Sequence, residues 1–94
     1  GRTAQKVSEK LALLAGRHQV ICITHLPQIA AMADSHYVIE KNVENASTVT
    51  SVRKLSDQES VGELARMLGG AEITDRVLES AGEMKELAAR TKKY

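Results

Sequence analysis

Apolar residues near the start of the chain recur three or four positions apart, which places them on one face of a helix. The pattern predicts a helix from about Thr3 to Ala15. Thr3 is expected to cap its start and Gly16 to end it. The residues on the predicted face are Ala4, Val7, Leu11 and Leu14.

A continuous apolar run, Val20–Thr24, follows this helix. A run rich in β-branched residues is typical of a strand covered on both faces in a parallel sheet. A helix followed by a buried strand is half of a βαβ unit, so the sequence predicts that the preceding strand is missing. Cys22 lies inside the run and is therefore interpreted as a small core residue and not as a nucleophile.

The next segments predict a short helix and a hairpin. Pro27 fits the first turn of a helix expected over residues 28–33, with Ile29 and Met32 facing inward. Residues 36–43 and 48–55 alternate imperfectly between apolar and polar positions. With turn-forming residues at 44–47 between them, they predict an antiparallel hairpin.

Two further helices complete the pattern. Ser56 and Glu59 form the sequence signature of a capping box, and the helix they open is expected to stop at Gly69-Gly70. The last helix is expected from Thr74-Asp75, with cations at its negative C-terminal end. The apolar stripes of the two helices are Val61, Leu64, Ala65 and Leu68 in the first, and Val77, Ala81, Met84 and Ala88 in the second.

Composition limits the classes of protein that fit. A chain of 94 residues allows one small domain, and with 2% aromatic residues its core must be aliphatic and marginal. A net charge of +1 gives no long-range attraction to DNA or membranes, and one Cys suits a reducing compartment. No apolar run approaches the roughly 20 residues of a membrane span. The start, without Met or a signal peptide, suggests a piece of a longer protein.

His25 is the candidate for chemistry. It directly follows the carboxyl end of the predicted strand, where open α/β sheets bind ligands. An imidazole there can contact a phosphate oxygen or an attacking water. Thr24 and Gln28 are its neighbours and are candidates for holding the ring or binding ligand. The alternative for all three is that they satisfy backbone groups of the loop.

The other polar residues give weaker indications of a functional site. His18 and His36 form no metal-ligand spacing with His25, and both are expected to be solvent-exposed at strand ends. Gly69-Gly70 is not followed by Lys-Ser or Lys-Thr, so it is not a P-loop. The cations that could contact DNA phosphates, against the default of a solvated helix end, are Lys85, Arg90, Lys92 and Lys93.

Several segments carry a family resemblance. Thr24-His25, a short helix, Ala33-Asp34 and the strand Tyr37–Lys41 resemble the switch region, or H-loop, of ABC ATPases. The chain as a whole is similar to the RecN family of SMC-like DNA repair ATPases. The segments most similar in sequence to that family are Ile23–Ala30, Val52–Leu55 and Glu63–Gly70. Gly1–Ala4 resembles the stretch after that family's D-loop.

The resemblance implies an α/β fold: residues 1–94 would be one partial P-loop NTPase (ABC ATPase) C-terminal lobe. It would hold one buried parallel strand, an antiparallel hairpin and flanking helices, with the H-loop but without Walker A, signature or Walker B. It further implies an ATPase head acting in DNA double-strand break repair and recombination. His25 would contact the γ-phosphate of ATP and position water. The full-length protein would use ATP and Mg²⁺, whereas the chain alone is expected to bind neither and to be inactive.

The expected partners follow from the same resemblance: the remainder of the head, a second head in a homodimer, and DNA through the whole protein. The expected location is the cytoplasm, associated with the nucleoid. An exposed strand edge predicts self-association of the chain. The alternative is a non-catalytic module that docks or dimerises through helix faces and the hairpin edge. Only the ATPase hypothesis requires an Asp-Glu pair ending an apolar strand within about ten residues upstream of Gly1.

Overall fold

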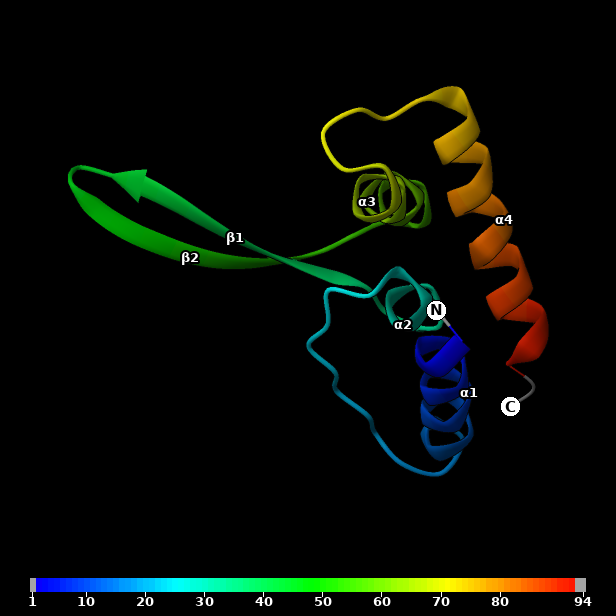
Figure 1. The fold of residues 1–94 in the computed structure, drawn as a ribbon. Helices are drawn as coiled ribbons and strands as arrows, with labels where there is room; N and C mark the ends of the chain where they lie inside the picture. The colour runs from blue at the N-terminus through cyan, green and yellow to red at the C-terminus, as the bar shows by residue number, and fades with distance from the viewer. Residues whose placement is uncertain (1, 93–94) are drawn as a thin grey trace.

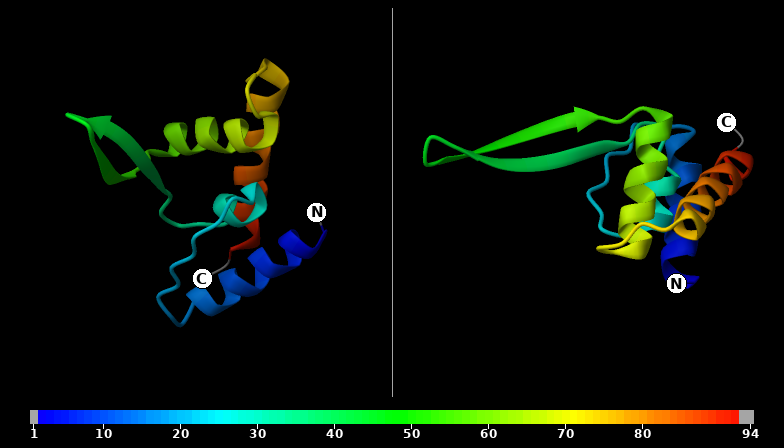
Figure 2. Two further views of the ribbon diagram at one scale, coloured as in Figure 1. Left: turned by 60° about the vertical axis from the view of Figure 1, so that its left-hand side comes forward. Right: turned by 90° about the horizontal axis from the view of Figure 1, so that it is seen from above.

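The computed structural model of the chain describes residues 2–92. The helices gather into one body, and a long hairpin extends away from it (Figures 1 and 2). None of the helices in this range has the length and apolar character that crossing a membrane requires. In chain order the elements are α1 (Arg2–Ala15), α2 (Pro27–Ala31), β1 (Tyr37–Glu44), β2 (Ser47–Lys54), α3 (Asp57–Gly69) and α4 (Asp75–Thr91).

The core is built mainly from alanine. Leu64 and Ala65 of α3 and Ala81 of α4 are completely buried, because the two helices pack directly on each other. The stripes expected on α3 and α4 are thus largely confirmed, although Leu68 is exposed. Small side chains allow close approach of helices but bury little apolar area each. The other buried members of the cluster are Ala12, Ala30, Ala31, Met32 and Ala88.

Helix α1 differs from its expected form in two ways. It already includes Arg2, so Thr3 lies inside the first turn and the prediction of an N-cap there is wrong. Its buried residues are Ala4, Ser8 and Ala12, while two large apolar residues of the predicted face are exposed. The buried face is therefore rotated toward small residues, because these fit against the neighbouring α2. The two exposed residues are Val7 and Leu14.

The prediction of a buried strand at Val20–Thr24 is wrong for this chain. The segment forms no regular structure, and Ile21 and Ile23 are 85% and 86% exposed. A strand requires a hydrogen-bonded neighbour, and within residues 2–92 the two strands present pair with each other. Cys22 is also exposed, so its interpretation as a core residue is wrong as well.

The hairpin prediction is confirmed, with each of its four strand ends shifted by one residue. β1 and β2 are antiparallel over eight residues each, with Glu44 opposite Ser47. Asn45 and Ala46 form the two-residue turn with φ of 48° and 64°, as a turn of the primed type requires. All of β2 is exposed. Because an isolated hairpin is marginally stable in water, its contacts at the root matter.

The signals predicted at both ends of α3 and at the start of α4 are confirmed. The hydroxyl of Ser56 accepts a hydrogen bond from the Glu59 amide at 3.1 Å, and the Glu59 carboxylate accepts one from the Ser56 amide at 3.0 Å. Thr74 caps α4 by accepting from the Val77 amide. Gly70 follows α3 with φ of 70°, a left-handed conformation that suits glycine. Helix α2 spans Pro27–Ala31, two residues shorter at its C-terminal end than predicted.

Replacing Ser56 by Ala is expected to lower the free energy of unfolding by about 1 kcal/mol, because the Glu59 amide loses its acceptor. Urea unfolding followed by circular dichroism measures this. Ser51→Ala on the exposed strand β2 is the matched control and should change stability far less. Equal losses for the two variants would contradict the assigned cap.

Candidate functional site

His25 is exposed and lies where the chain bends immediately before α2. The Thr24 hydroxyl accepts a hydrogen bond from the Leu26 amide at 3.0 Å, which holds this bend. Gln28 is half-buried in the first turn of α2. The His25 ring makes no hydrogen bond or ion pair with another residue of the described range. Thr24 therefore shapes the loop, while the imidazole of His25 is available to a ligand.

Helix α2 fixes the segment that follows His25. The Leu26 carbonyl accepts hydrogen bonds from the amides of Ile29 at 3.2 Å and Ala30 at 3.1 Å. Ala30, Ala31 and Met32 are buried, and α2 contacts α1, α3 and α4. Since residues 20–23 on the other side are exposed, His25 lies near the boundary between uncovered chain and a packed core.

Lys92 connects the end of α4 to the end of α2. Its Nζ donates to the Ala33 carbonyl and to the Asp34 carboxylate, both at 3.2 Å, and its side chain is only 14% exposed. The default of a solvated helix end is therefore wrong for this residue.

The other members of the basic set do not join Lys92 in one open patch. Lys85 donates to the Asp57 carboxylate at 3.4 Å, and Arg90 is exposed. Lys93 lies outside the described residues. With two of the cations already paired inside the fold, the described part of the set offers less charge to a phosphate backbone than its sequence indicates.

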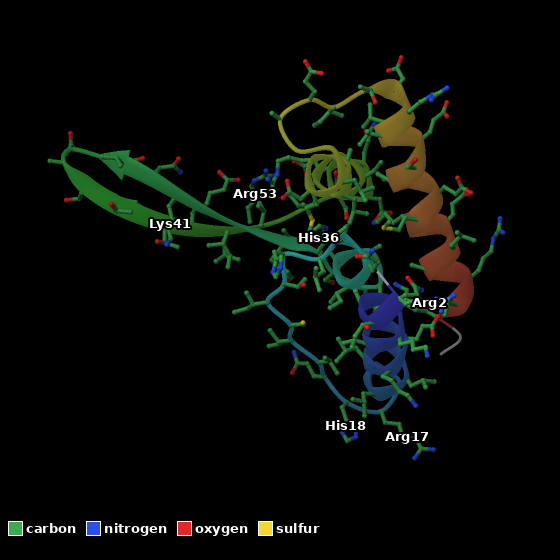
Figure 3. All side chains as sticks on the ribbon, in the orientation of Figure 1. Arg2, Arg17, His18, His36, Lys41 and Arg53 are labelled. Carbon is green, nitrogen blue, oxygen red and sulfur yellow. The ribbon has the colours of Figure 1, made fainter. Side chains whose placement is uncertain are left out.

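A second polar site lies at the root of the hairpin, where Figure 3 shows His36 and Arg53. The Nδ1 atom of His36 is 2.7 Å from the Ser60 hydroxyl, and Ser60 is 1% exposed. The prediction that His36 is solvent-exposed is wrong, because the hairpin leaves the body beside α3. Arg53 donates to Glu59 at 2.6 Å and to Glu40 at 3.4 Å. The two strands are thus tied to the first turn of α3.

Burial at the root of the hairpin changes the pKa of His36. It lowers the pKa of His36 below the ordinary value of 6.5, because the charged imidazolium loses water. Glu63 opposes the shift and Lys85 adds to it. The pKa of Glu59 is lowered chiefly by the hydrogen bond from the Ser56 backbone and then by Arg53. Sequence reasoning missed the contact between His36 and Ser60, since nothing local relates residues 24 positions apart.

The free energy of unfolding is expected to decrease as the pH falls below about 6.5. The unfolded chain then protonates at His36 while the folded chain resists protonation, so acid favours unfolding; above that pH the group is neutral in both states. Urea unfolding at about pH 7.5 and about pH 5.5 measures the change. His36→Gln should reduce the difference between the two pH values. Exposed His18 provides the control, because His18→Gln should leave that difference intact.

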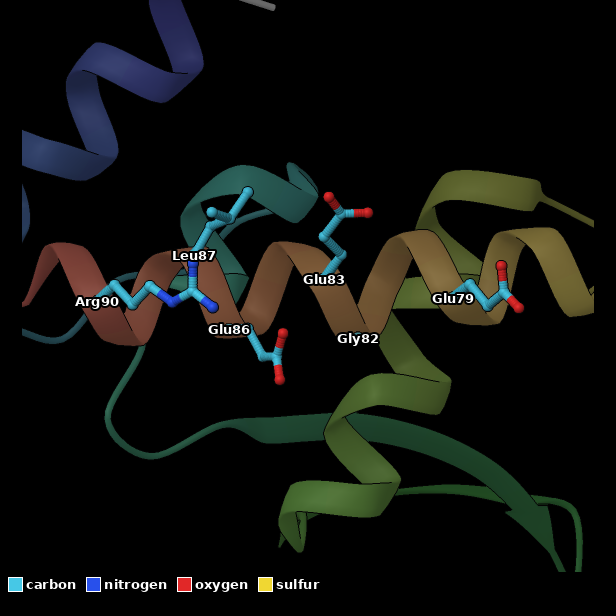
Figure 4. Close-up of a pocket in the computed structure, with 6 residues that line it drawn as sticks. All are labelled: Glu79, Gly82, Glu83, Glu86, Leu87 and Arg90. Atoms are coloured by element: carbon cyan, nitrogen blue, oxygen red, sulfur yellow. The ribbon is translucent and has the colours of Figure 1, made fainter.

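Two further features of the described residues do not form a binding site. A shallow hollow runs along the outer face of α4 (Figure 4). Its lining comes from this single helix and is mainly acidic, which is typical of a solvated face. Within residues 2–92 no group of three or more His, Cys, Asp or Glu side chains is placed to hold a metal ion. The hollow is lined by Glu79, Gly82, Glu83, Glu86, Leu87 and Arg90.

Comparison with known proteins gives the family. The chain is 46% identical over 92 residues to the DNA repair protein RecN of Bacillus subtilis, 44% over 87 residues to that of Haemophilus influenzae, and 46% over 84 residues to that of Deinococcus radiodurans. These alignments cover 98%, 93% and 89% of the chain but 16%, 16% and 15% of the relatives. No family model matches the chain.

The chain therefore matches one segment of longer proteins named DNA repair protein RecN. It belongs to the RecN family and corresponds to a C-terminal piece of it, about one sixth as long as the relatives.

Proposed function

We propose that this chain is the C-terminal part of an ATP-hydrolysing head in a RecN-like protein of DNA double-strand break repair and recombination. The observation that supports it best is the junction at His25. An exposed apolar segment ends there in an available imidazole, and a helix fixed in the core begins two residues later. This order of features suits a strand that is completed by the rest of a head.

His25 is proposed to contact the terminal phosphate of ATP. A neutral imidazole donates from one nitrogen and accepts at the other, so it can contact a phosphate oxygen or orient the attacking water. Negative charge on the phosphate oxygens must be stabilised during phosphoryl transfer. Thr24 holds the bend through its hydrogen bond with Leu26, and Gln28 is near enough in sequence to be a secondary contact.

The remaining contacts to the nucleotide are proposed to come from the rest of the protein. Mg²⁺, when bound, would neutralise charge on the phosphates, and its ligands are expected outside residues 2–92, which bring together no suitable cluster. We further propose a second head as the partner in a homodimer, DNA as a partner of the whole protein, and a cytoplasmic, nucleoid-associated location. The chain alone, with one catalytic group, is proposed to be inactive.

The segment Val20–Thr24 is proposed to become a strand when the rest of the head supplies parallel neighbours. Ile21 and Ile23 then change from exposed to covered, and that burial favours docking by roughly 1.5–3 kcal/mol for each side chain. The exposed Val7 and Leu14 of α1 add to the apolar surface available to the same partner.

In the full-length protein, His25→Ala is expected to lower ATP turnover by about 100-fold, because a donor to the developing charge is lost. Steady-state ATP hydrolysis measures the effect. His18→Ala, which removes an exposed histidine seven residues away, is the matched control and should retain activity. Unchanged turnover after His25→Ala would exclude the proposed role.

The isolated 94-residue chain is expected to self-associate through its uncovered apolar segment. Replacing Ile21 and Ile23 together by Ser should shift sedimentation toward the monomer, because the two most exposed large apolar residues of the segment become polar. Val43→Ser near the hairpin tip is the control at another exposed apolar residue. A wild-type chain that stays monomeric at high concentration would refute the expectation.

The hairpin favours a second candidate, a non-catalytic docking module. By strand register, Ile39 and Val52 are opposite each other and share one face with Tyr37 and Val43. All four are exposed, so this face has apolar area for a partner. Under this hypothesis His25 is a loop residue, and its substitution leaves turnover of the full-length protein unaffected.

A further inference from the structure

We propose that Lys92 is a positioning residue for His25: it holds the far end of α2 from the end of α4 and so determines where the switch loop lies. The contact of Lys92 with Ala33 and Asp34, just after α2, does not depend on the function proposed for His25. Its consequence for ATP turnover rests on the function proposed for His25.

Lys92 makes a specific contact with the residues just after α2. One ammonium group reaches two acceptors on consecutive residues, the Ala33 carbonyl and the Asp34 carboxylate, each at 3.2 Å. The partners are 59 and 58 positions apart in the chain. A surface lysine usually keeps its ammonium group in water, whereas this side chain is 14% exposed. Losing hydration is offset here by a charge-assisted hydrogen bond and an ion pair.

Helix α2 transmits this contact to His25. It is five residues long, about 7.5 Å at 1.5 Å per residue, and His25 precedes it by two positions while Ala33 follows it by two. A single turn and a half of helix behaves as one short rigid piece, so restraining its C-terminal end also restrains its N-terminal end. The Thr24–Leu26 hydrogen bond then joins the loop of His25 to that piece.

Apolar packing keeps α2 in the core but supplies little directional restraint against sliding. Its buried contacts come from Ala30, Ala31 and Met32, packed in a cluster in which most members are also alanine. Methyl groups present a smooth surface and have few interlocking shapes, whereas a hydrogen bond depends on direction. Lys92 therefore supplies a directional restraint that apolar packing does not.

The test uses the full-length protein and four variants: Lys92→Met, Lys92→Arg, His25→Ala and the double variant Lys92→Met with His25→Ala. Lys92→Met is expected to lower kcat for ATP by about 10-fold with KM nearly unchanged, because small displacements of a positioned group reduce rate steeply. Lys92→Arg should restore most of the activity. In the His25→Ala background, Lys92→Met should have no further effect, because the group that it positions is absent.

Lys85→Met is the matched control. Lys85 is also a largely covered lysine of α4 that pairs with a carboxylate, but its partner Asp57 lies on α3. Its loss should leave kcat unchanged. An equal reduction of kcat by Lys85→Met, or an additional loss from Lys92→Met in the His25→Ala background, would reduce Lys92 to a general stabilising residue and overturn the proposal.

Amide hydrogen exchange separates failure of this proposal from failure of the proposed function. Lys92→Met should speed exchange at Leu26 and at Met32–Ala33, whereas Lys85→Met should not. If His25→Ala alone leaves turnover unchanged, the ATPase role of His25 is wrong, and the exchange rates alone decide whether Lys92 positions the loop. Unchanged exchange at both ends of α2 overturns the positioning role in every case.

Discussion

Burial of the five-residue helix α2 between α1, α3 and α4 is the interaction on which the rest of the structure depends. A helix of this length does not persist alone in water, because nucleating it orders several residues for few hydrogen bonds. Its burial through Ala30, Ala31 and Met32 links helices that are distant in sequence. The loop of His25 leaves one end of α2 and the hairpin leaves the other, so both are located by this packing (Figure 1).

Polar contacts restrain the orientation of elements that pack on a core made mainly of small alanine side chains. Lys92 binds the chain just after α2, and the pairs His36–Ser60 and Arg53–Glu59 bind the hairpin root to α3. The ion pair between Arg53 and Glu59 is exposed and contributes little to stability by itself, since both of its side chains are well hydrated. Its effect is on orientation: the hairpin leaves the body along one direction although β2 is exposed along its whole length (Figure 2).

The uncovered surface of the chain agrees with its place in a longer protein. The chain matches about 16% of the length of its RecN relatives. Ile21 and Ile23 have no hydrogen-bonded strand beside them among the described residues and are far more exposed than isoleucine usually is. The same absence of neighbours exposes Cys22.

The features that could be predicted correctly from the residues alone are mainly local. The capping box of Ser56 and Glu59, the helix stop at Gly70 and the hairpin turn depend on neighbouring residues, so their chemistry can be seen in the sequence. The residues around His25 likewise resemble those of one family, and the relatives confirm that family.

Which residues are covered depends on how the elements pack in three dimensions. The apolar run at Val20–Thr24 has the composition of a buried strand, yet burial requires neighbours that local pattern does not contain. For the same reason two polar side chains are partly buried by contacts that the local pattern does not contain. His36 lies beside a partner 24 positions away, and Lys92 lies beside partners 58 and 59 positions away. Caps and turns arise from contacts within a few residues, whereas burial and long-range hydrogen bonds arise from how the helices pack.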